Sequence, residues 1–345
     1  MNKTHSESNI RKVALTSLSG TSIEWYDFFL YGAAAGLVFP KLFFGEVDPT
    51  TALILSFLTF AAGFIARPVG GIIFGHFGDI IGRKRTLVIA LMLMGIASTF
   101  IGLLPTYETI GIAAPILLTL LRFCQGIAIG GQWGGAMLLV TESAPSDRRG
   151  YYGAFAQAGA PVGVILANIA FISVSSLTTE EDFLSWGWRI PFLISFVLVF
   201  ISMYIQLKLE DTKAFKELEA MKSSSDSKPK TIRSSPIVEA LRRYPRRISL
   251  AAGAFLSVQV TFYILVAFVL AFGVQTTDLS RNDLLMAVLI GSALMVPTQF
   301  FFSDYSDKHG RKGIFMLGAL LTALWSFALF PLIETGNFYL VILSV

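Results

Sequence analysis

Long apolar segments recur along the chain at a spacing that suits repeated crossings of a lipid bilayer. A membrane-spanning α-helix needs roughly 20 mostly apolar residues. Segments of about this length cover residues 14–39, 52–75, 86–104, 110–141, 151–176, 189–207, 248–274, 284–303 and 313–333. The sequence therefore predicts an all-α polytopic membrane protein with about nine complete helices.

The composition agrees with a chain built for the membrane. Hydrophobic residues make up 54% of the 345 residues and charged residues 14%, whereas soluble domains carry about 25% charged residues. After Gly336 and Asn337 a further apolar stretch, FYLVILSV, begins and stops after eight residues, which is too short to cross a bilayer. We therefore expect a truncated second half that ends inside a tenth helix.

The positions of the positive charges indicate the orientation in the membrane. Cytoplasmic loops hold the excess of Lys and Arg. Here these residues gather in the polar N-terminal tail and in alternate loops, while the other loops contain only Lys41, Arg189 and Arg281. This pattern predicts a cytoplasmic N-terminus with no removable signal peptide. It also explains the net charge of +4 as a topology signal, so we expect no nucleic-acid partner.

Few residues are available for metal or enzymatic chemistry. One Cys and three His exclude an intrachain disulfide and leave no cluster with metal-ligand spacing. The sequence contains no G-x-x-x-x-G-K-[ST] loop that could bind nucleotide phosphates, and no loop combines a nucleophile with a base. We therefore expect neither an enzyme nor an ATP-driven pump, and no metal or cofactor.

Two loops, GHFGDIIGRKR at 75–85 and SDYSDKHGRKG at 303–313, match at an offset of 228 residues. Each places an acid at the end of one helix, a glycine for a tight turn, and cations at the start of the next helix, where the helix dipole disfavours them. Membrane orientation explains the cations but not the acid and the glycine. We predict an inter-helix charge latch that holds one conformation, formed by Gly75, Asp79, Gly82, Arg83, Lys84, Asp307, Gly310, Arg311 and Lys312.

This repeat divides the chain into two related halves. Residues 209–247 form the one long polar interval, with a Ser-rich middle and a basic end. We expect an N-terminal six-helix half at 1–208, a cytoplasmic linker at 209–247 and an incomplete C-terminal half at 248–345.

The first of these loops resembles the G-x-x-x-D-x-x-G-R-[KR]-[KR] motif of the major facilitator superfamily. RFCQGIAIGG resembles the superfamily's R-x-x-Q-G pattern through Arg122, Gln125 and Gly126. IEWYDFFLYG and GWRIPFLIS resemble the metabolite:proton symporter branch, whose members carry shikimate, α-ketoglutarate, citrate, proline and betaine. The resemblance covers essentially the whole chain. It implies two pseudo-symmetric six-helix halves that work by alternating access, as a monomer in a bacterial inner membrane.

Four charged residues, Glu24, Asp27, Arg67 and Arg122, lie within the predicted spans. Charges are costly in hydrocarbon and therefore mark a candidate functional site. Counting along the helices from the nearest cytoplasmic charge puts Glu24 and Arg67 at roughly 18 Å depth and Asp27 at roughly 22 Å. Arg122 lies nearer the outer face. We therefore expect Arg67 to pair with one of the two acids.

Two acids beside one arginine leave one carboxylate that can titrate. Burial disfavours the charged form of a carboxyl and a nearby cation favours it, so a site that rehydrates can load and release a proton. We predict that Asp27 or Glu24, together with Arg67, couples transport to the proton gradient. The alternative is a static buried ion triad that fixes helix packing.

Arg122 is the main candidate for substrate binding. Its planar guanidinium matches a carboxylate, and substrate sites in such carriers lie near the bilayer midplane. The alternative is a stabilising pair with a carboxylate or a backbone carbonyl. We expect the substrate to be a small carboxylate or zwitterion. Further candidates, each with an interhelical hydrogen bond as the alternative role, are Tyr26, Gln125, Gln157, Gln259 and Tyr263.

The sequence thus predicts a secondary active transporter that takes up a small metabolite together with protons. Three alternatives remain open. They are a transporter-like sensor or binding protein that does not translocate, an inactive truncated carrier, and a carrier of the sugar branch. The acidic and arginine-rich closing motif of that branch is not matched by LEDTKAFKELE after the sixth helix, apart from a faint likeness at Glu210 and Asp211.

Overall fold

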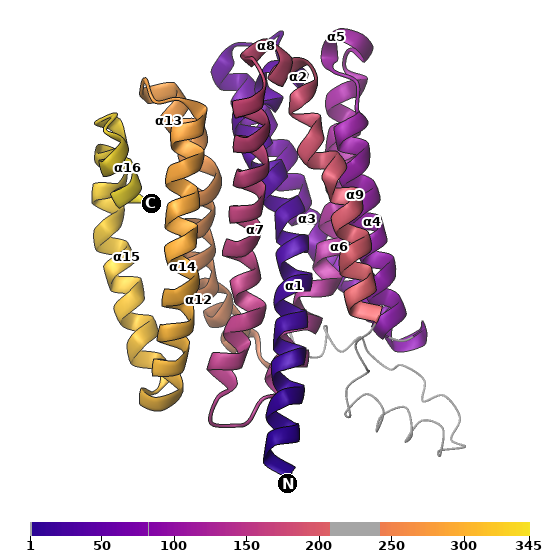
Figure 1. The fold of residues 1–345 in the computed structure, drawn as a ribbon, viewed down its shortest axis with the longest axis vertical. Helices are drawn as coiled ribbons and strands as arrows, with labels where there is room; N and C mark the ends of the chain where they lie inside the picture. Colours follow the sequence, from indigo (N-terminus) through magenta and orange to yellow (C-terminus); the bar gives the residue numbers. More distant parts are fainter. Residues whose placement is uncertain (1, 82, 208–241) are drawn as a thin grey trace.

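The computed structural model describes residues 2–81, 83–207 and 242–345, and this part of the chain is helical throughout, with no strand (Figure 1). The first half contains α1 (Asn2–Leu37), α2 (Phe39–Phe43), α3 (Pro49–Ile81), α4 (Arg83–Leu103), α5 (Tyr107–Ile110), α6 (Ala113–Ser143), α7 (Arg149–Leu177), α8 (Glu180–Asp182), the π-helix η1 (Phe183–Gly187) and α9 (Arg189–Leu207). The second half contains α12 (Pro245–Tyr263), the π-helix η2 (Ile264–Phe268), α13 (Val269–Thr276), α14 (Arg281–His309), α15 (Arg311–Glu334) and α16 (Phe338–Ser344).

Every apolar segment predicted from the sequence contains a helix, and the all-α membrane fold is confirmed. Six helices of the described chain are long and apolar enough to cross a membrane, or seven if the bent pair Glu180–Gly187 and Arg189–Ile201 forms one span. α1, which carries Glu24 and Asp27, is not among them. The apolar part of α4, Val88–Leu103, is shorter than the others. Most of the predicted 209–247 linker lies outside the described residues.

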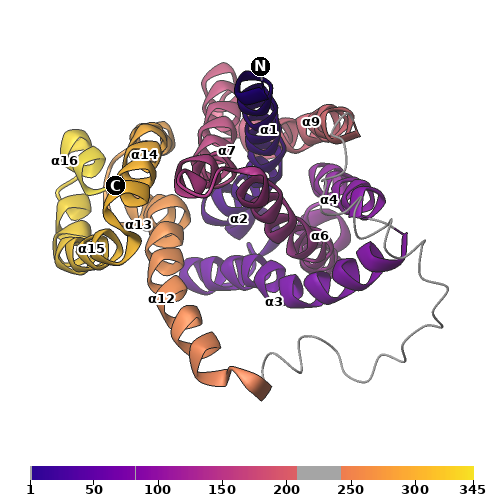
Figure 2. The same cartoon turned by 90° about the horizontal axis from the view of Figure 1, so that it is seen from below.

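The long helices run side by side between two faces of the bundle. The N-terminus lies at one face, here called the N-terminal face, and α2, α5 and α8 lie at the opposite face (Figure 1). Viewed from the N-terminal face, α14 lies beside α7, and α15 and α16 lie beyond α14 (Figure 2). The α7–α14 pair is therefore the main seam between the two halves.

Glycines bring α1 against α7 and α3 against α6, the two most extensive helix pairs. A Cβ atom added at Gly163 of α7 would lie 2.5 Å from Trp25 Cβ and 2.7 Å from the backbone nitrogen of Tyr26. Glycine at such contacts lets helix backbones approach closely. Gly163 thereby fixes the part of α1 that carries both buried acids.

Aromatic side chains fill the space around the middle of α1. Phe28 is fully buried and packs edge-on against Phe64, with ring centroids 5.3 Å apart. Tyr263 also packs against Phe64, at 4.8 Å. Tyr263 directly precedes η2, which contacts α1. Single π-turns within α-helices are frequent at functional sites, so this one marks the side of α1 that faces the second half.

The close approach at Gly163 can be tested with a matched pair of variants on α7. We expect Gly163→Ala to lower the free energy of unfolding by about 1–3 kcal/mol, the usual effect of overpacking. Gly153→Ala should be neutral or slightly stabilising, because its Cβ would lie 3.5 Å from Thr141 Cγ2, an ordinary contact, and alanine favours the helix. Unfolding in detergent measures both. Equal stability of the two variants would contradict the packing account.

Candidate functional site

The two acids predicted to act in proton coupling are both buried in the middle of α1. Asp27 is 1% exposed and Glu24 is 5% exposed. Neither carboxylate oxygen of Asp27 has a hydrogen-bond partner among the described residues, whereas Glu24 has an interaction partner of its own. The polar neighbours of Asp27 are the hydroxyls of Ser98 and Ser195, from α4 and α9, and the guanidinium of Arg122, from α6. Asp27 is therefore a buried acid that has two hydroxyls beside it but no hydrogen bond of good geometry.

Arg122 is fully buried and held by a short polar relay. Its Nη1 donates to Gln125 Oε1 at 3.0 Å, and Gln125 Nε2 donates to Ser98 Oγ at 2.6 Å. Ser98 also neighbours Asp27. A Cβ atom at Gly63 of α3 would lie 2.7 Å from Arg122 Nε, so glycine there leaves room for the arginine. The relay therefore positions Arg122 beside the acid without a direct ion pair.

Arg122, which is buried, and Arg67, which is partly buried, stack on the same aromatic ring. The guanidinium carbon of Arg122 lies 4.2 Å from the centroid of Phe28, and that of Arg67 lies 4.4 Å from it. Arg122 also lies 4.4 Å from the ring of Tyr31, and Arg67 lies 4.6 Å from the ring of Phe64. The negative faces of the rings attract both cations. Phe28 thus allows two like charges to occupy neighbouring positions.

Unsatisfied polar atoms converge on this region. They are Oδ1 and Oδ2 of Asp27, Nε and Nη2 of Arg67, Nε and Nη2 of Arg122, and the hydroxyl of Tyr263. Arg67 lies close enough to Tyr263 to act on it as a hydrogen-bonding neighbour, and both arginines act on it electrostatically. Buried polar groups are almost always hydrogen-bonded in folded proteins. Several unsatisfied polar atoms around one aromatic cluster therefore indicate a site that binds water or a polar ligand.

We expected Arg67 to pair with Glu24 or Asp27, and the described residues show no ion pair between Arg67 and Asp27. Arg67 instead lies over the rings of Phe28, Phe64 and Trp25, and Arg122 is the cation that acts on Asp27. Counting residues along separate helices gives each residue's depth but not its direction around the bundle, and this direction decides which cation faces the acid.

The other predicted substrate-binding residues have different surroundings. Tyr26 donates its hydroxyl to the carbonyl of Pro191 on α9 at 2.7 Å, the interhelical role that the sequence left open. Both ends of the Gln125 side chain are occupied by the relay. Gln157 on α7 and Gln259 on α12 are partly buried, and their role stays a prediction.

Several residues of the site were not predicted from the sequence. Ser98 and Ser195 are ordinary hydroxyls in apolar helices, and no pattern distinguishes them. Phe28 and Tyr31 could have been found, because they follow Glu24 at positions i+4 and i+7, on one helix face. Aromatic residues in line with a buried acid were a signal for cation binding.

A second candidate site lies at the N-terminal face, where α14 ends beside the start of α7. Asp307 Oδ1 accepts a hydrogen bond from the backbone N–H of Gly150 at 2.9 Å, and Oδ2 accepts one from Tyr151 at 2.8 Å. The first N–H groups of a helix lack intrahelical partners, and a negative charge is favoured there. A residue of the second half therefore caps a helix of the first half.

Further charges surround this cap. Arg311 lies 3.2 Å from Asp307, and Asp304 pairs with Lys308 at 2.6 Å and with Arg148 at 3.7 Å. The cap also needs a glycine, since a Cβ atom at Gly150 would lie 2.6 Å from Asp307 Oδ1.

The predicted latch residues are only partly brought together. Gly310 ends α14 at φ +85°, a conformation that favours glycine. Arg311, the next residue, pairs with Asp307. Lys312 is exposed. In the first loop, Gly75 lies within α3. Gly82 and the side chains of Asp79, Arg83 and Lys84 lie outside the described residues.

The two-arginine stack can be tested by replacing its central ring. We expect Phe28→Leu to lower the free energy of unfolding by about 1–2 kcal/mol more than Phe29→Leu, because both replacements open a similar cavity but only Phe28 carries two cation–π contacts. Phe29 is a matched control, 2% exposed on the same helix. Chemical unfolding in detergent gives the comparison, and equal losses would show that the stack contributes no stability.

Comparison with known proteins identifies the family. Residues 17–345 match the model of the Major Facilitator Superfamily. The chain is 42% identical over 333 residues to the inner membrane metabolite transport protein YhjE of Escherichia coli, covering 94% of this chain and 73% of that protein. It is 40% identical over 353 residues to the E. coli shikimate transporter, covering 99% and 77%, and 32% identical over 336 residues to the E. coli proline/betaine transporter, covering 96% and 66%.

Solved structures agree on the fold. The E. coli xylose transporter XylE in a partially occluded inward-open conformation superposes with a TM-score of 0.70 at 18% identity, covering 97% of this chain and 82% of that one. The resemblance drawn from the sequence motifs is thus confirmed. The chain belongs to the Major Facilitator Superfamily, within its metabolite-transporting branch, and is a secondary transporter rather than an enzyme.

Proposed function

We propose that this transporter carries a small organic acid or zwitterion into the cytoplasm together with protons, and that the proton gradient is its energy source without any cofactor. The observation that carries the proposal is the set of unsatisfied buried atoms on Asp27, Arg67, Arg122 and Tyr263. These groups combine an acid able to exchange a proton with two cations able to hold an anion.

Asp27 is the better candidate for the coupling proton. Removing a carboxylate from water strongly disfavours its charge, and a nearby cation restores it. Asp27 is 1% exposed with unpartnered oxygens, and Arg122 is its charged neighbour. Binding of an anion at Arg122 would weaken the support that this cation gives to ionised Asp27. Proton and substrate would therefore load together, as symport requires.

The free donors of the arginines favour a carboxylate as the substrate group. Each guanidinium has two buried nitrogens without a partner, and a planar fork of donors binds a carboxylate better than a point charge does. The shikimate and proline/betaine transporters, which are relatives of this chain, are named for substrates that carry a carboxylate. Both supports point to an acid or a zwitterion rather than to a neutral sugar.

We propose that Asp307 and Arg311 form a latch for alternating access. The Asp307 cap joins the halves at the N-terminal face, so opening that face requires both hydrogen bonds to break. The excess of Lys and Arg on this side supports a cytoplasmic N-terminus. The similarity to an inner membrane protein of E. coli supports the same location here, with a single copy as the working unit.

Proton coupling can be tested by uptake into proteoliposomes, with shikimate as the probe. Asp27→Asn should abolish accumulation driven by a pH gradient but retain exchange of shikimate at equal pH, because only the proton is lost. Glu24→Gln is the matched control and should keep accumulating. The reverse result would show that Glu24, and not Asp27, carries the coupling proton. Accumulation by both variants would contradict coupling through these acids, and binding without transport in the parent would favour a sensor.

The latch can be tested by distance measurements between spin labels. In a Cys124→Ser background, labels would be placed at Ser146→Cys and Gly313→Cys, both exposed at the N-terminal face. Asp307→Ala should increase the population with a long distance, since the α7 cap is lost. Asp304→Ala removes the same charge from α14 and an exposed pair with Arg148 but no backbone cap, so we expect a much smaller shift than for Asp307→Ala. Identical distributions for the two variants would exclude a specific latch at Asp307.

A further inference from the structure

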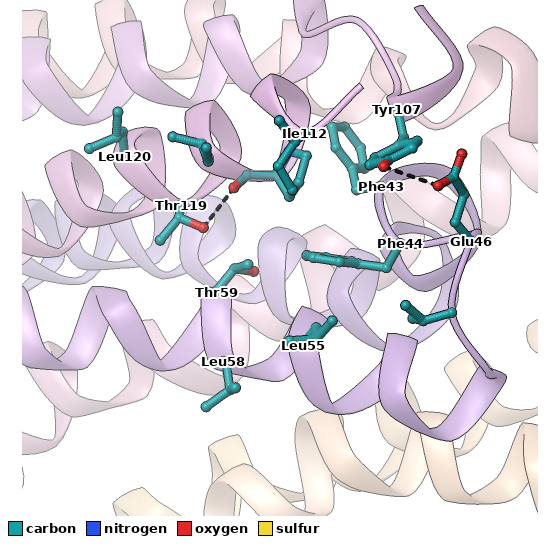
Figure 3. A pocket seen from close by; sticks show the side chains of 13 residues that line it. Phe43, Phe44, Glu46, Leu55, Leu58, Thr59, Tyr107, Ile112, Thr119 and Leu120 are labelled. Carbon is teal, nitrogen blue, oxygen red and sulfur yellow. Dashed lines mark hydrogen bonds between the residues drawn. The ribbon is translucent and has the colours of Figure 1, made fainter. Parts of the chain in front are cut away.

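A groove opens between α3 and α6 at the face opposite the N-terminus (Figure 3). Its volume is about 630 Å³, within the roughly 300–1,000 Å³ of typical ligand sites. Phe43 and Phe44 close it from the side of α2. Glu46 and Tyr107 lie together at one end, and Leu58 and Leu120 lie toward the other (Figure 3). The groove belongs to the first half and is separate from the buried arginines.

The walls of the groove are apolar and exposed on the surface of the described helices. Leu58 is 59% exposed and Leu120 is 56% exposed. The hydroxyls in the wall have partners already. Thr59 accepts from Tyr31 and donates to the carbonyl of Ser56, both at 2.7 Å, and Thr119 donates to the carbonyl of Pro115 at 2.7 Å. This part of the groove therefore offers dispersion contacts and no polar group in need of a ligand.

The polar groups are confined to the end of the groove near the membrane surface. Tyr107 donates its hydroxyl to Glu46 Oε2 at 3.1 Å. A carboxylate has about four acceptor positions, so most of the acceptor capacity of Glu46 is left for another donor. No cation is among the residues that line the groove, and Lys41, on the same segment as Glu46, pairs instead with Glu180. Glu46 is therefore the one charged residue of the lining and has no cation within it.

The distance between the two ends suits a lipid. Leu58 lies nine residues after Pro49, the first residue of α3, and this separation corresponds to roughly 14 Å along the helix. One end is therefore at the membrane surface and the other is well inside the hydrocarbon, whose total thickness is about 30 Å. An acyl chain would run along the apolar wall while its headgroup stays at Glu46.

From this charge complementarity we infer that the groove is a binding site for a phospholipid with a primary ammonium headgroup, phosphatidylethanolamine. The ammonium group donates to the Glu46 carboxylate, and one acyl chain lies between α3 and α6. An anionic headgroup without an amine, such as phosphatidylglycerol, meets an unpaired acid at the same place. The site thus selects lipids by headgroup, which general contact between apolar helices and a bilayer does not.

Tyr107 keeps Glu46 in place for this role. The hydrogen bond to the Glu46 carboxylate raises the pKa of the Tyr107 hydroxyl above its ordinary value, as expected for a phenol that donates to a carboxylate. Since it occupies one acceptor position of Glu46, it holds the carboxylate over the groove. Tyr107→Phe would leave the charge present but free to rotate away.

The proposal is tested by counting lipids that stay bound to the purified protein. The full chain would be exchanged into vesicles with equal amounts of phosphatidylethanolamine and phosphatidylglycerol, extracted in mild detergent, and analysed by native mass spectrometry. We expect phosphatidylethanolamine to be retained preferentially. Glu46→Gln should weaken that preference by about threefold, a magnitude typical of one exposed ion pair, and Tyr107→Phe by less.

Two controls separate this site from other effects. Glu108→Gln removes the same charge from the neighbouring position, outside the groove lining, and should leave the preference unchanged. Leu58→Trp should reduce retention by filling the groove, while thermal unfolding reports whether the variant is folded. Equal retention of both lipids by the parent would overturn the proposal. An unchanged preference in Glu46→Gln, or an equal loss in Glu108→Gln, would also overturn it.

Discussion

The burial of Asp27 and Arg122 in one cluster is the constraint on which the rest of the structure depends. Removing one partner of a buried charge pair destabilises a protein far more than removing both, so the fold has to keep these two groups together. Gly63 makes room for the guanidinium, Gln125 and Ser98 connect it to the acid's surroundings, and Phe28 supports its face. Such an arrangement stabilises the charges without neutralising them, and leaves capacity for a proton and a ligand.

The seam between the halves gives this cluster a way to change its surroundings. At the N-terminal face Asp307 caps α7, and at the opposite face Arg281 of α14 pairs with Glu180 of α8. Asn168 of α7 donates to the carbonyl of Leu285 between them, at 3.3 Å. Polar contacts thus join α14 to the first half at both ends and between them, so separating the halves at either face requires breaking a small number of defined interactions. In the proposed alternating-access cycle, rocking about this seam would expose the buried acid to one face at a time.

Much of the fold could be predicted from the sequence, because spans of about 20 apolar residues and the positive charges between them directly reflect bilayer physics. The acids in α1 were equally visible as charges in an apolar segment. Their partners were not visible. Whether Arg122 or Arg67 lies toward Asp27 depends on how each helix is rotated about its own axis in the bundle, and the sequence does not give this rotation. Likewise the repeat pointed to Asp307, but its target at the start of α7 lies more than 150 residues away in sequence and only tertiary packing brings the two together.

The central claim is that Asp27 and Arg122 form one electrostatic unit, and a double-mutant cycle tests it most directly. The free energy of unfolding in detergent would be measured for Asp27→Asn, Arg122→Gln and the double variant. We expect each single variant to be destabilised, and the double variant to lose about 1–2 kcal/mol less than the sum of the two, as found for residues that share one network. Losses that simply add would contradict the account, because they would mean that the acid and the arginine are buried independently.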